Sequence, residues 1–147
     1  MTTPADQWMV AAVHESAHAC AYAQYGKPFI SLRIYQTDSG AIVGSVKAPA
    51  GRYDPLMKAV VNLAGPLAKQ RYTGCSWQAL TDTVAKTDIG MALGALARLG
   101  AEQPGLDKVV ALTCAIVDCQ WPNIQRVADE LVERRQLDYD EVLQLIV

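Results

Sequence analysis

The chain contains only two histidines, and both lie in one short segment with a glutamate between them. His14, Glu15 and His18 form the sequence H-E-x-x-H. On a helix, residues four positions apart share a face, so both imidazoles can bind one metal ion from the same side. Glu15 is then close enough to act on a water bound to that ion without being a ligand itself. This arrangement is typical of zinc hydrolases.

The residues around the motif favour a metal site over a chance pairing of two core histidines. Alanine, valine and cysteine side chains make this predicted helix apolar on nearly all sides. A buried helix does not carry two histidines and a glutamate without a partner that compensates their polarity. We therefore predict that His14 and His18 bind one Zn²⁺ per chain.

A catalytic zinc site needs a third protein ligand and a fourth position that is open to water. No third histidine exists, so the ligand must be a carboxylate or a cysteine. Spacing alone leaves five candidates open, namely Asp54, Cys75, Asp82, Asp88 and Glu102.

The motif helix is the first of several elements that the sequence pattern predicts. Capping residues, proline, glycine and apolar periodicity predict helices over residues 4–25, 55–72, 83–98, 107–120, 123–135 and 139–146. Strands over 29–35 and 41–46, joined by the turn residues Asp38–Gly40, form a predicted hairpin, whose second strand we expect at an edge. Pro122 predicts a break or a kink in the chain, and residues 75–82 show no clear pattern. We expect one domain over 1–147, an α+β, mainly α-helical, zincin-like fold with a small antiparallel sheet.

Composition excludes several classes of function. Thirteen lysines and arginines against fifteen acidic residues give a net charge of −2, with no basic excess of the kind that binds nucleic acid. No apolar run is long enough for a transmembrane helix, and the N-terminus does not resemble a signal peptide. Four cysteines without a C-x-x-C pair suit reduced thiols and disfavour a purely structural zinc site. We expect a cytoplasmic protein without a membrane segment.

The segment from Val13 to Ala19 resembles the active-site helix of the FtsH-type zinc peptidases, the proteolytic domain of membrane AAA proteases. Further segments resemble the later motifs of this family, in the same order. They are the hairpin residues 40–44, the helix residues 63–74 with the letters L-A-G, the segment 87–92 with an aspartate followed by an alanine four positions on, and the C-terminal residues 127–142. The resemblance covers nearly the whole chain and implies the peptidase fold.

The resemblance also implies a role for each matching residue. His14 and His18 would be zinc ligands, Glu15 the general base, and Asp88 the third ligand, with Asp82 as its competitor. Lys69 stands where the family has a glutamate, and Ala17 replaces a glycine. The chain has neither the phosphate-binding loop of the ATPase module nor a membrane anchor.

These observations predict a stand-alone zinc-dependent endopeptidase that hydrolyses extended or unfolded polypeptides, using Glu15 to activate the water on the zinc. The expected partners are peptide or unfolded protein substrates, and the sequence does not decide between a separate ATPase, a homo-oligomer or neither. The alternative is a non-catalytic metal-binding or protein-interaction module that retains the fold. Tyr53 and Tyr72 are candidates for stabilising a tetrahedral intermediate, and the sequence selects neither.

Overall fold

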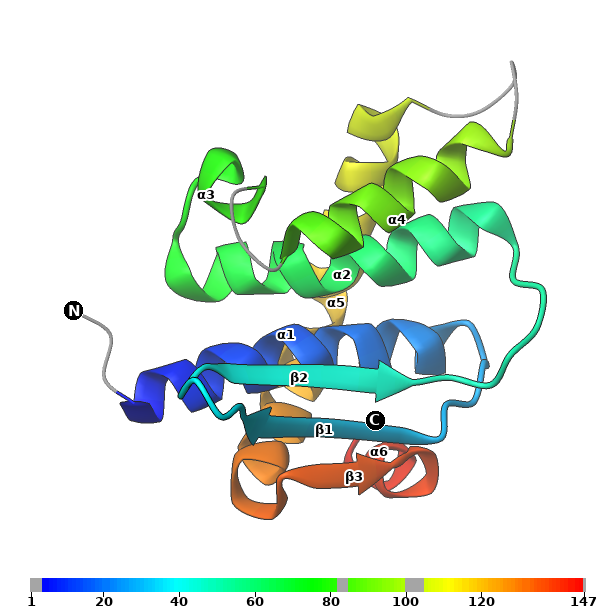
Figure 1. Cartoon of the computed structure of the whole chain (residues 1–147). Coiled ribbons are helices and arrows are strands. Elements are labelled where there is room, and N and C mark those ends of the chain that lie inside the picture. The colour runs from blue at the N-terminus through cyan, green and yellow to red at the C-terminus, as the bar shows by residue number, and fades with distance from the viewer. Residues whose placement is uncertain (1–3, 82–84, 100–104, 147) are drawn as a thin grey trace.

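A computed structural model describes residues 4–81, 85–99 and 105–146 (Figure 1). Its elements follow in the order α1 (Pro4–Gln24), β1 (Ser31–Gln36), β2 (Ile42–Lys47), α2 (Pro55–Thr73), α3 (Trp77–Thr81), α4 (Ala85–Ala97), α5 (Leu106–Arg134), β3 (Gln136–Asp138) and α6 (Tyr139–Leu145). The expected class, mainly helical with a small antiparallel sheet, is confirmed. None of the helices in the described ranges combines the length and the hydropathy that crossing a membrane requires.

The sheet has three strands in the order β2-β1-β3, and both pairings are antiparallel. The predicted hairpin pairs Ser31 with Lys47 at one end and Gln36 with Ile42 at the other. Its turn contains Gly40, whose φ of 89° is a left-handed conformation that glycine adopts without strain. β2 is an outer strand, as predicted, so one of its edges is free to pair with another chain.

The helices form layers around α1 and α2 (Figure 1). α1 packs against α2, α5 and the sheet, and α2 also packs against α4, so α2 lies between two hydrophobic cores. Met57, Val61 and Ala64 of α2 belong to the core shared with α1, while Val60 and Leu63 belong to the core shared with α4. Because the elements that carry the candidate site are held by buried apolar surface on both sides, the site has a rigid frame.

Local sequence signals explain where α2 begins and ends. The Asp54 side chain accepts a hydrogen bond from the Met57 backbone N–H at 3.0 Å, and Pro55 occupies the first helical position. At the other end Gly74 adopts φ 72° and its N–H donates to the carbonyl of Gln70. The predicted helix over 55–72 is therefore confirmed almost to the residue.

The predicted break at Pro122 is wrong. α5 runs without interruption from Leu106 to Arg134 and contains Pro122 in its interior. Proline removes one helical hydrogen bond and costs about 3 kcal/mol within a helix. Val117 before it and Ile124 after it are both buried on one continuous helix face, and burial of this face offsets the cost.

Two short elements were not predicted. β3 is only three residues long, with the single buried residue Leu137, so it offers no alternating pattern to detect. α3 lies in the segment 75–82, which showed no clear pattern. The predicted helix over 83–98 appears as α4, although the predicted residues 83 and 84 lie outside the described ranges.

Candidate metal centre

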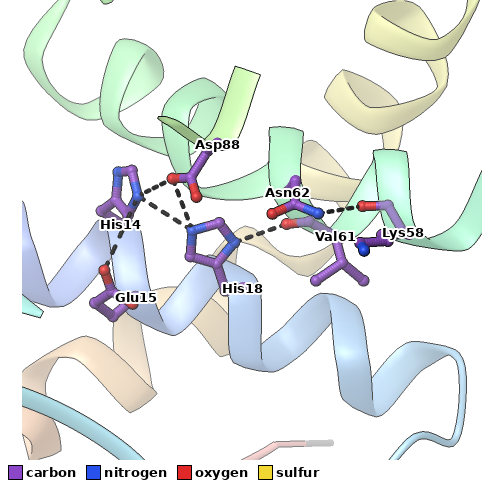
Figure 2. A network of polar contacts seen from close by, with 7 residues as sticks. All are labelled: His14, Glu15, His18, Lys58, Val61, Asn62 and Asp88. Carbon is purple, nitrogen blue, oxygen red and sulfur yellow. Dashed lines mark hydrogen bonds and ion pairs between the residues drawn. The ribbon is translucent and has the colours of Figure 1, made fainter. Parts of the chain in front are cut away.

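Three side chains from two helices converge on one point between α1, α2 and α4 (Figure 2). His14 and His18 lie one turn apart on α1, and Asp88 lies in the first turn of α4. Within the described ranges these three side chains form a group that could hold a metal ion, with their ligand atoms all within 4.8 Å of one another. The sequence motif thus supplies two candidate ligands locally, and the packing of α4 brings a third candidate from about seventy residues along the chain.

The distances within this group suit a tetrahedral metal site. His14 Nε2 lies 2.8 Å from Asp88 Oδ2, His18 Nε2 lies 3.2 Å from the same oxygen, and the two Nε2 atoms are 3.1 Å apart. Ligands placed tetrahedrally at about 2.0–2.1 Å from a zinc ion lie about 3.3 Å from one another. The observed triangle is slightly smaller than this, so one ion above it can contact all three atoms and keep a fourth position open.

A backbone contact sets the tautomer of His18. Its Nδ1 donates a hydrogen bond to the Val61 carbonyl of α2 at 2.7 Å (Figure 2). With its proton held on Nδ1, a neutral His18 would direct the lone pair of Nε2 towards His14 and Asp88, whereas a protonated His18 carries a second proton there. Orientation of a ligand histidine by a carbonyl on its other nitrogen is the usual support for a metal site.

The charges and hydrogen bonds around His18 and Asp88 favour a positive charge within this group. Burial alone lowers the pKa of His18, but the hydrogen bond and charge of Asp88, the charge of Glu15 and the bond to Val61 together raise it to about 9. Burial would raise the pKa of Asp88, yet the hydrogen bonds and charges of His14 and His18 lower it instead. Without a metal ion, a proton on His18 therefore supplies the positive charge. The two imidazole nitrogens and one carboxylate oxygen form a donor set that suits Zn²⁺.

Glu15 lies beside this group but outside it. Its Oε1 is 4.0 Å from His14 Nε2, and only 7 % of the residue is exposed. Burial raises the pKa of Glu15 and Asp88 adds to this effect, while the charges of His18 and His14 oppose it. A carboxylate with a raised pKa next to a metal position can accept a proton from water and pass it on.

Two glycines make the close packing of the site possible. A Cβ on Gly65 of α2 would lie 2.4 Å from His18 Nε2 and 2.8 Å from His14 Nε2, inside the space where an ion would bind. A Cβ on Gly44 of β2 would lie 2.4 Å from Glu15 Cγ. Both glycines lie in the segments 40–44 and 63–74 that resemble family motifs, but the motifs do not reveal these contacts. A glycine inside a helix, where alanine is more stable, was the available signal for Gly65.

The group opens into a groove with a volume of about 530 Å³. α1 forms one side of the groove, residues 41–44 at the start of β2 form another, and the end of α2 closes it with Lys69 and Thr73. His14 and Glu15 line this groove. The same groove therefore passes the start of β2 as well as His14 and Glu15.

The structure separates the candidates for the third ligand that spacing left open. Asp88 lies with the two histidines, whereas Asp54 caps α2 and Cys75 lines the groove outside the ligand group. Asp82 and Glu102 lie outside the described residues.

Neither tyrosine considered for stabilising an intermediate belongs to the groove lining that the structure describes. The Tyr53 hydroxyl donates to the Pro49 carbonyl at 2.8 Å, and Tyr72 is an exposed residue beside Met9 and Val13.

The comparisons with known proteins provide no independent identification. No protein-family model matches the chain. No curated protein matches it either. The likeness to FtsH-type peptidases consequently stays a prediction that rests on the motifs.

Proposed function

We propose that this chain is a zinc-dependent endopeptidase that cleaves extended or unfolded polypeptides. The observation that carries the proposal is the convergence of His14, His18 and Asp88 within 3.2 Å of one another, with Glu15 buried beside them at the wall of an open groove. A zinc ion held by these three residues would polarise the scissile carbonyl and acidify a water molecule.

The chain's own residues supply the proton transfers. Glu15 accepts the proton from the attacking water and then delivers it to the leaving amine. Its burial and raised pKa favour this shuttle, because a carboxylate that is too weak a base cannot remove the proton. His18 keeps its orientation through the bond to the Val61 carbonyl, so the ligand set does not rearrange while Glu15 changes its charge.

The groove supports the class of substrate. β2 is an outer strand, and its first residues line the groove next to Glu15. An extended chain can pair with this edge through backbone hydrogen bonds and thereby present its carbonyl to the metal position. A stably folded segment cannot do so, because its backbone groups are already paired.

The decisive experiment compares zinc-loaded wild type with Glu15→Gln on unfolded casein. We expect the variant to keep one zinc per chain and to lose activity by at least about a hundredfold, as expected when a general acid–base is removed. Glu133→Gln, which changes an exposed glutamate of α5, is the matched control and should behave like wild type. Wild-type activity in Glu15→Gln would overturn the mechanism, and zinc binding without any cleavage by the wild type would favour the non-catalytic module.

A further inference from the structure

Lys69 of α2 is one of the residues that line the groove. It follows Gly65 by four residues on α2, so both lie on the same helix face, and Gly65 is the residue that contacts the two imidazoles. Lys69 of α2 and Ile42 of β2 both line the groove, and Lys69 lies one helical turn beyond Gly65. The partly buried lysine therefore borders the groove in which we propose that the substrate binds.

The charge of Lys69 has no internal counterpart. Of the described residues that line the groove, it is the one with a permanent positive charge, and its neighbours there include the apolar side chains of Val10, Ile42 and Val43. It forms no ion pair within the described part of the chain, and in particular none with Glu15 or Asp88. Lys69 as a residue is half-buried, and an unpaired ammonium group beside apolar side chains gains from an anionic partner that the substrate brings.

The position of Lys69 along the groove fixes where that partner should be. Four helical residues correspond to about 6 Å along α2, and an extended peptide advances about 3.3 Å per residue, so the distance from Gly65 equals about two substrate residues. α2 runs opposite to β2, which places Lys69 towards the Ile42 end of the strand (Figure 1). A substrate that pairs antiparallel with β2, the more stable pairing, has its residues after the scissile bond at this end.

We infer that Lys69 is a specificity-determining residue, which binds a carboxylate on the second substrate residue after the cleaved bond. This inference rests on the proposed peptidase function and names its substrate class. The small net charge of −2 predicts no general preference for charged substrates. We expect the preference to arise locally, from the single lysine among the described residues that line the groove. The carboxylate can belong to an aspartate or glutamate side chain or to the C-terminus of the substrate.

The test uses zinc-loaded protein and one peptide scaffold with a single cleavable bond. The second residue after that bond is Glu, Gln or Lys in internal peptides that continue to an amidated end. Two further peptides stop at that residue, which is Gln, with either a free carboxylate or an amide. We expect wild type to prefer carboxylate over its neutral counterpart by about tenfold in kcat/KM, equivalent to 1.4 kcal/mol. A preference for Glu over Gln in the internal peptides would identify a side-chain carboxylate. A preference for the free carboxylate over the amide in the peptides that stop at that residue would identify the C-terminus.

Three variants make the result specific. Lys69→Gln should lose the preference, so that its kcat/KM values for the Glu and Gln peptides become equal, and Lys69→Glu should prefer the Lys peptide over the Glu peptide. Lys108→Gln removes an exposed lysine of α5 and is the matched control, with selectivity unchanged. The zinc content of each variant shows whether the site is intact.

Peptide binding to the zinc-loaded Glu15→Gln variant gives a second readout, because it measures selectivity without turnover. An order of peptides that is identical in wild type and Lys69→Gln overturns the role of Lys69 alone. Absence of both cleavage and binding for every peptide overturns the proposed function, and this inference with it.

Discussion

Replacing Gly65 with alanine should change the stability of α2 and the affinity for zinc in opposite directions. Alanine is more stable than glycine inside a helix by about 1 kcal/mol, so the change alone should stabilise α2. The new Cβ would lie 2.4 Å from His18 Nε2, 2.7 Å from His18 Cε1 and 2.8 Å from His14 Nε2. Ordinary contacts between such atoms begin at 3.4 Å, so the imidazoles must move by about 1 Å.

The consequence for zinc follows from the same distances. Zinc must lie about 2.0–2.1 Å from each nitrogen, and the added methyl group would occupy that space. We expect Gly65→Ala to weaken zinc affinity by about a hundredfold, the upper end of the range for disturbing the support of a metal ligand. Competition with a chromogenic chelator measures this loss, and loss of peptidase activity should accompany it.

A matched control exists on α4. A Cβ on Gly94 meets no atom within 4 Å, so Gly94→Ala gains helix propensity without disturbing the site. We expect Gly94→Ala to raise the free energy of unfolding by up to about 1 kcal/mol and to bind zinc like wild type. Wild-type zinc affinity in Gly65→Ala would refute the reasoning, because the ion would then have to lie away from the two Nε2 atoms.

Three further predictions concern single groups. Asp88→Ala should weaken zinc affinity strongly and Asp82→Ala only slightly in a chelator competition, and the reverse order would make Asp82 the ligand. In metal-free protein the pKa of His18 is raised from 6.5 to about 9, so its contribution to folding is complete below pH 6.5 and is lost as the pH rises through 9. Chemical denaturation of the metal-free protein should show that the free energy of unfolding falls by up to about 3 kcal/mol between pH 6.5 and pH 9. His18→Gln should abolish this pH dependence, and the same pH dependence in His18→Gln as in wild type would contradict the assignment to His18. Ser16→Ala should raise the free energy of unfolding by about 1 kcal/mol in thermal denaturation, because the buried Ser16 hydroxyl has no hydrogen-bond partner in the described structure; a clear destabilisation would show a hidden partner.

Most of the fold could be predicted because the sequence marks its element ends clearly. Asp54 with Pro55 begins α2, Gly74 ends it, and the turn before Ile42 closes the hairpin. The predicted break at Pro122 was wrong because the local cost of a proline within a helix competes with the long-range packing of the helix face. The cost of a proline is local, whereas the buried face that holds α5 together depends on packing against α1, which the local pattern does not show.

The residues of the candidate site also differ in whether local sequence or tertiary packing brings them together. His14, Glu15 and His18 could be found because one helix turn places them together, whatever the rest of the chain does. Asp88 could be selected only through the family resemblance, since tertiary packing brings it to the histidines. The role of Gly65 could not be derived from sequence, because it depends on how closely α2 approaches α1.

One diffraction measurement tests the central claim most directly, namely that three side chains hold a zinc ion beside Glu15. Crystals of the zinc-loaded protein should show a single strong anomalous peak at the zinc absorption edge, about 2.0–2.2 Å from His14 Nε2, His18 Nε2 and an Asp88 carboxylate oxygen. Glu15 should lie next to the ion without binding it. A zinc peak elsewhere in the molecule, or no peak at these three residues in zinc-saturated crystals, would contradict the account.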